Sequence, residues 1–186
     1  MNSSEQMESM LDNPDFRFSD IKLQQFNRLM ENELQRIYAI EKIQMTYLGK
    51  IIPLAIVGGL IDILEQHAYG IQDHRSRLEK IFLILGLKPS SNTAKTAGDV
   101  MELMFKEAIS NIKGLQRSPA FSDRVIIMET QKMAHYRIAL YMTLSGWAKS
   151  LRLFGVSELL EDCLDEIINT DLTLSELAES AITDQV

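Results

Sequence analysis

The sequence has little of several features that mark other classes of protein. Its 186 residues include one cysteine, Cys163, which cannot form an intramolecular disulfide. The longest apolar run, residues 51–61, contains a proline and two glycines and falls short of the roughly 18 residues that a membrane span requires. The first residues lack the basic and apolar regions of a secretory signal. These absences predict a protein of the reducing cytoplasm with no membrane association.

Clusters of basic residues are also missing. The chain has 19 Lys and Arg against 26 Asp and Glu, a formal net charge of -7, and no Lys or Arg after residue 156. Because phosphate backbones are bound by clustered Lys and Arg, we expect no nucleic-acid partner. The hydrophobic content of 46% and the length suit one globular domain that needs no disulfide or structural metal to fold.

Helical periodicity dominates the chain, and no segment alternates as a half-buried strand does. We expect helices over about 20–52 with Ser19 as the N-cap, 60–85 after a turn at Gly58-Gly59, 97–113, and 119–154 up to Gly155. A last helix follows with Ser157 as its N-cap. This pattern predicts an all-α four-helix bundle with one short extra helix between the second and third long helices. Residues 1–18 are expected to be a flexible or partly docked extension, 19–180 the bundle and 181–186 a tail.

Polar residues interrupt the apolar faces of these helices. Glu41, His67, His74 and Asp171 lie at core positions, and His135 lies within the third long helix. A buried carboxylate is costly unless it is paired or binds a metal. Two interpretations remain open. The first is a metal site built from oxygen and imidazole ligands on facing helices, and the second is a set of carboxylate–imidazole hydrogen bonds without metal.

Spacing argues against an ordinary two-metal site. The chain contains no Glu-x-x-His pair, which supplies ligands from two helices in di-iron bundles. His67 and His74 are seven residues apart, about 10 Å along a helix axis, so they cannot both bind one ion in a regular helix.

Several motifs resemble those of one family. Residues 37–42 (IYAIEK) are similar to a first-helix LYDAEK motif, and residues 131–139 (QKMAHYRIA) to a third-helix QKVEHYEIA motif. Residues 67–79 and 159–179 fit its second and last helices. In this order the motifs cover about residues 26–180, and the chain resembles the YciE/YciF family of ferritin-like bacterial stress proteins.

The resemblance implies a ferritin-like bundle whose core can hold a pair of metal ions, with a link to stress responses. Matching polar positions are Glu41, His67, His74, His135, Glu166 and Asp171. The chain departs from the pattern where carboxylates are expected: Ala134 and Arg137 replace two glutamates, Ile167 a third, and Ala39 an aspartate. Arg137 would repel a nearby ion, and we expect its charge to pair with Glu41, Glu166 or Asp171 in place of the ion.

These observations favour a non-catalytic bundle protein with a degraded di-metal site, no cofactor, and a structural or interaction role. We expect a homodimer and leave open a further protein partner. The alternative is an iron- or manganese-dependent oxidase or peroxide-handling protein with a reduced metal site. Its ligands would be Glu41, His67, His135, Glu166 and Asp171.

Overall fold

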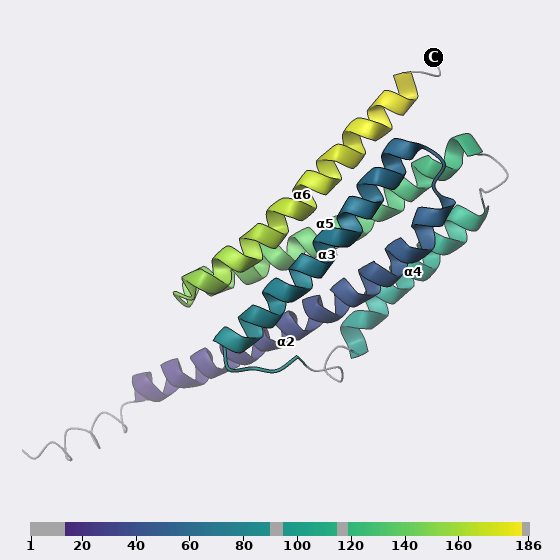
Figure 1. The fold of residues 1–186 in the computed structure, drawn as a ribbon. Coiled ribbons are helices and arrows are strands. Elements are labelled where there is room, and N and C mark those ends of the chain that lie inside the picture. Colours follow the sequence, from purple (N-terminus) through teal and green to yellow (C-terminus); the bar gives the residue numbers. More distant parts are fainter. Residues whose placement is uncertain (1–13, 90–94, 115–118, 184–186) are drawn as a thin grey trace, which may run out of the picture.

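The computed structural model describes residues 14–89, 95–114 and 119–183, and the regular structure in these segments is helical. The helices are α2 (Pro14–Ile51), the short 3-10 helix η1 (Ile52–Leu54), α3 (Gly58–Ile84), α4 (Lys95–Gly114), α5 (Pro119–Ser150) and α6 (Phe154–Thr183). In Figure 1, α2, α4 and α6 run in one direction, and α3 and α5 run in the opposite direction.

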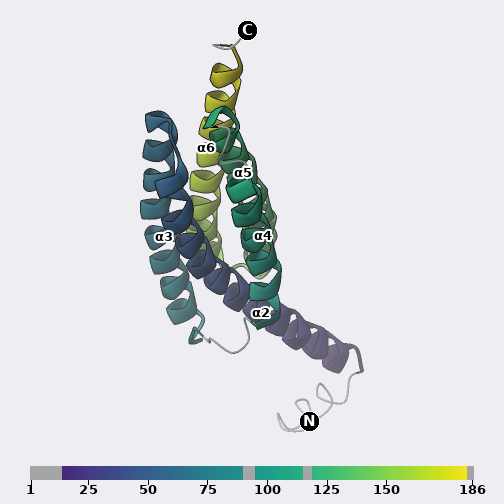
Figure 2. The ribbon, with the colours of Figure 1, turned by 90° about the vertical axis from the view of Figure 1, so that its right-hand side faces the viewer.

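Four of these helices form the bundle. Helix α2 packs against α3 and α5, and α6 packs against the same two helices, so that α2 and α6 lie on one diagonal. Helix α4 packs on the outside against α2 and α5 (Figures 1 and 2). The predicted short helix between the second and third long helices is therefore confirmed, as is the all-α class.

Helical periodicity predicts the buried faces well. The residues of α3 that recur at intervals of three and four positions, as one face of a helix does, are all buried: Leu60, Leu64, His67, Ile71, His74, Leu78 and Phe82. On α2, Gln44 is fully buried and Met45 is only partly so, while on α4 Val100 is exposed and Met101 is buried. The buried face of α2 therefore extends to Gln44, and that of α4 is centred nearer Met101 than Val100, because the sequence pattern alone does not define the centre of a broad stripe.

The start of the first helix differs from the prediction. Helix α2 begins at Pro14 and continues through Ser19, so Ser19 is not its N-cap. Proline suits a first helical position because the N–H that it lacks would have no partner there. Residues 14–18 of the expected extension are thus helical, and residues 181–183 of the expected tail belong to α6. The remaining residues of both segments, 1–13 and 184–186, lie outside the described part.

The corner between α2 and α3 is made by η1 and residues 55–57. Gly58 and Gly59 are the first residues of α3 rather than the turn. The backbone N–H groups of Ile56 and Val57 donate to the Asp123 carboxylate on α5, at 3.0 and 2.7 Å. This carboxylate satisfies donors at the exposed corner and ties it to α5. At the other end of α3, which finishes at Ile84, Gly86 has a φ of +67°, a conformation that glycine commonly adopts just after a helix.

The corner between α5 and α6 also differs from the prediction. Helix α5 ends at Ser150, Arg152 has a φ of +59°, and α6 begins at Phe154. Gly155 and Ser157 therefore lie in the first turn of α6 and are neither its break nor its N-cap. The Ser157 hydroxyl lies 3.1 Å from that of Ser145 and so links α6 to α5.

None of the helices in the described segments is both long and apolar enough to cross a membrane.

Candidate functional site

A buried ion pair lies at the centre of the bundle. The Arg137 side chain on α5 and the Glu41 side chain on α2 are both fully buried. Arg137 Nη2 donates to Oε2 and Oε1 of Glu41 at 2.9 and 3.0 Å, and Nε donates to Oε1 at 3.2 Å. Of the three carboxylates expected to pair with Arg137, Glu41 is thus the one that does so. Such a two-pronged contact is the strongest geometry that arginine makes with a carboxylate.

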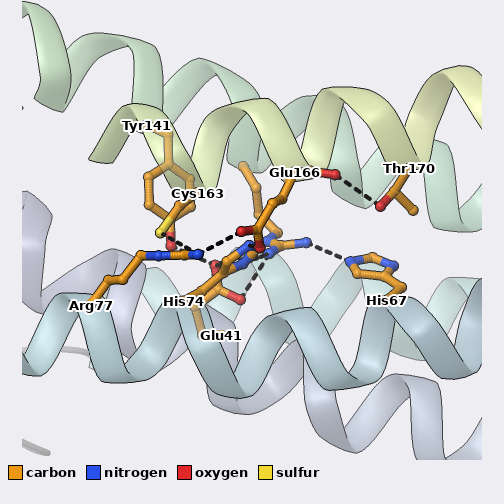
Figure 3. A network of polar contacts seen from close by, with 9 residues as sticks. Glu41, His67, His74, Arg77, Tyr141, Cys163, Glu166 and Thr170 are labelled. Atoms are coloured by element: carbon orange, nitrogen blue, oxygen red, sulfur yellow. Dashed lines mark hydrogen bonds and ion pairs between the residues drawn. The ribbon is translucent and has the colours of Figure 1, made fainter. Parts of the chain in front are cut away.

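The same guanidinium binds both core histidines of α3. Arg137 Nη1 lies 2.9 Å from His67 Nε2, and Nη2 lies 2.9 Å from His74 Nδ1 (Figure 3). The two rings are too far apart along α3 to share a metal ion, but the planar fork of arginine reaches both. A guanidinium only donates hydrogen bonds, so both of these ring nitrogens accept. The hydrogen-bond pattern therefore assigns the ring hydrogen to Nδ1 of His67 and to Nε2 of His74.

Tyr141 completes the group, which we call the Arg137 cluster: Glu41, His67, His74, Arg137 and Tyr141. The Tyr141 hydroxyl donates to Glu41 Oε1 at 2.8 Å. Burial opposes the charge on Glu41, but the charge of Arg137 and the hydrogen bond from Tyr141 lower the pKa of Glu41 to about 2. Burial and the neighbouring carboxylate raise the pKa of Tyr141 well above its ordinary value. At neutral pH the cluster therefore holds an ionised Glu41 and a protonated Tyr141.

Burial, together with the charge of Arg137, lowers the pKa of His67 to about 3. His67 is therefore neutral at physiological pH, which agrees with its role as an acceptor from Arg137.

Glu166 on α6 links the cluster to the surface. Its Oε2 lies 3.0 Å from His74 Nε2, and its Oε1 accepts from Arg77 Nη2 at 2.6 Å. Burial raises the pKa of Glu166, but the bond from Arg77 and the neighbouring His74 outweigh it and lower that pKa overall. Arg77 also lies 3.9 Å from the sulfur of buried Cys163. Burial raises the pKa of this thiol to about 12, so the one cysteine of the chain is an inert thiol.

Two of the predicted ligands lie apart from the cluster. His135 Nε2 is 3.3 Å from Asp171 Oδ2, and the His135 side chain is 65% exposed. His135 is two residues from buried Arg137, which places it on the opposite side of α5. The structure therefore separates the five predicted ligands into Glu41 and His67 in the cluster, Glu166 at its edge, and the His135–Asp171 pair elsewhere.

The residues of the cluster do not fit a metal ion. Both oxygens of Glu41, Nε2 of His67 and Nδ1 of His74 face the guanidinium, so a fixed positive charge lies where their lone pairs converge. A cation at this position would have to displace Arg137 and would meet its charge. Within the described segments, no three His, Cys, Asp or Glu side chains are grouped so as to hold a metal.

Several polar partners in this region were not predicted from the sequence. Tyr141 and Arg77 were not predicted as site residues. Tyr141 lies four residues after Arg137 on α5, and Arg77 lies three residues after His74 on α3. A spacing of three or four residues places Tyr141 on the same helix face as Arg137, and Arg77 on the same face as His74. This spacing could have predicted that both residues lie near the cluster. Gln44 is buried without a hydrogen-bond partner for its side-chain amide in the described segments.

Four long helices around a central polar cluster define a ferritin-like helical bundle. The chain belongs to the family described as "Domain of unknown function (DUF892)", which matches residues 25–186, and it is a member of the YciF group. This confirms the family resemblance found in the sequence.

Three similarities to known proteins support this assignment. Protein YciF of Escherichia coli strain K12 is 28% identical over 112 residues, which are 60% of this chain and 66% of YciF. The structure of YcfI from Rhodopseudomonas palustris matches with a TM-score of 0.75 and 27% identity, covering 81% of this chain and 92% of that one. The structure of the E. coli stress protein YciF matches with a TM-score of 0.78 and 23% identity, covering 85% and 97%.

Proposed function

We propose that this protein is a non-catalytic, stress-associated member of its family, in which Arg137 has taken the place of a metal centre. The role is structural or one of interaction with other proteins. The observation that carries the proposal is the binding of one guanidinium by Glu41, His67 and His74 from two helices. These side chains are of the ligand types that iron or manganese bundles use, and here their lone pairs are directed at a cation that belongs to the chain.

The chemistry of the cluster also supports a structural role. Glu41 is ionised and paired, Tyr141 is protonated, and the Cys163 thiol is buried with a raised pKa. The side chains of the cluster are buried, and the pKa values of Glu41, His67 and Tyr141 are shifted away from neutrality, whereas an acid or base catalyst needs access to solvent and a pKa near neutrality. The link to stress comes from the E. coli relative, which is described as a stress protein, and a structural role has been suggested for the Rhodopseudomonas relative.

The proposal includes a homodimer in the cytoplasm. Large apolar side chains remain exposed on one protomer, including Leu83 and Ile84 at the end of α3. Sedimentation velocity tests the oligomer: a dimer is expected at micromolar concentration, and a monomer throughout would contradict this part of the proposal.

Metal analysis tests the central claim. The untagged protein would be expressed with iron, manganese and zinc available, its metal content measured by mass spectrometry, and its melting temperature recorded with and without chelator. We expect far less than one ion per chain and the same melting temperature with and without chelator. A metal that bound only the folded state would stabilise it, and its removal by chelator would lower the melting temperature. Glu41→Gln is the matched variant, since glutamine keeps an acceptor but loses the charge.

The opposite result would favour the oxidase or peroxide-handling alternative. Near-stoichiometric iron or manganese that is lost in Glu41→Gln, with a chelator-sensitive melting temperature, would overturn the proposal. Consumption of peroxide by the loaded protein would then be the next assay.

A further inference from the structure

We draw no further inference here: the strongest candidate, the apolar surface patch at the C-terminal end of α3, where Leu83 and Ile84 are 80% and 58% exposed, carries none, because nothing in the structure shows what covers it.

Discussion

Arg137 is the residue on which the core of this protein depends. Its side chain makes hydrogen bonds to Glu41, His67 and His74, which come from two other helices. An apolar core would need none of these contacts, but once Glu41 is buried its charge requires a partner. The arginine supplies the positive charge and also reaches both imidazoles, which a lysine could not do with a single ammonium.

Substitution of Arg137 tests this dependence. We expect Arg137→Met to lower the free energy of unfolding by about 3–5 kcal/mol, because it leaves the Glu41 charge buried without its partner. The double variant Glu41→Leu/Arg137→Met should recover most of this loss, since no buried charge remains. Urea unfolding of the wild type, both single variants and the double variant measures the coupling. A single variant as stable as the wild type would show that the pair contributes nothing.

The cluster also predicts how stability changes with pH. The pKa of His67 is lowered from 6.5 to about 3, so between these values the unfolded chain binds a proton that the folded chain does not. Stability therefore falls as the pH drops through this window, by at most about 1.4 kcal/mol per pH unit from this residue. Glu41, lowered from 4.5 to about 2, adds a loss of the same sign at more acidic pH.

Unfolding measured at about pH 7, 6 and 5 checks the contribution of His67, because Glu41 is ionised in both states over most of this range. His67→Gln is the control, since glutamine keeps an acceptor for Arg137 and does not titrate. We expect a flatter profile for this variant. Identical slopes in the two proteins would contradict the assignment of a neutral, buried His67.

At the scale of the helices, periodicity predicted the faces better than the ends. Seven positions of α3 that recur at intervals of three and four residues are buried, because each lies on one side of a regular 3.6-residue helix. The expected caps Ser19 and Ser157 are both inside helices. A serine can act as an N-cap only where the backbone enters the helix, and the packing of neighbouring elements decides where that point lies. At the corner before α3, for example, the backbone N–H groups are bound by Asp123 from another helix.

Substitution by alanine should change the free energy of unfolding in opposite directions at two glycines, one inside α3 and one just after it. Gly70 lies inside α3 with room for a methyl group, so Gly70→Ala is expected to raise the free energy of unfolding by about 0.5–1 kcal/mol. Gly86 has a φ of +67° at the end of the same helix, so Gly86→Ala should lower it by about 1 kcal/mol despite open space around it. Thermal unfolding monitored by circular dichroism separates the two. Shifts of the same sign would contradict one of these backbone assignments.

At the scale of the whole molecule, the bundle brings side chains from α2, α3, α5 and α6 to one level of the core. The fold is shared with structures from E. coli and Rhodopseudomonas palustris at identities of 23% and 27%. The arrangement of the helices is thus tolerant of large changes in sequence, and the charge at its centre depends on a few positions. Ala134 and Arg137 are two of these, both buried on α5.

We therefore expect that carboxylates at these two positions would give the core an affinity for metal. The double variant Ala134→Glu/Arg137→Glu places further acidic groups near Glu41 and removes the internal cation. Without metal it should be less stable than the wild type, because like charges in the core repel. Manganese at about 100 times its dissociation constant should then stabilise the variant by about 2.7 kcal/mol.

Differential scanning calorimetry with and without manganese measures this effect. The variant Ala134→Gln/Arg137→Gln is the neutral control and should not respond, nor should the wild type. A response of all three proteins would locate the metal elsewhere, and no response of the acidic variant would show that the bundle cannot form a site at this level.

The sequence by itself determined the helical class, the order of the helices, most of the buried faces and the presence of acidic and imidazole groups in the core. Each of these follows from the spacing of residues along a single helix. Only the tertiary structure decided which polar groups meet. Arg137 and Glu41 are 96 positions apart, and His135 is separated from the cluster although it is two residues from Arg137. The reason is that the rotation and height of each helix relative to its neighbours come from the packing of whole faces, which periodicity along one helix does not specify.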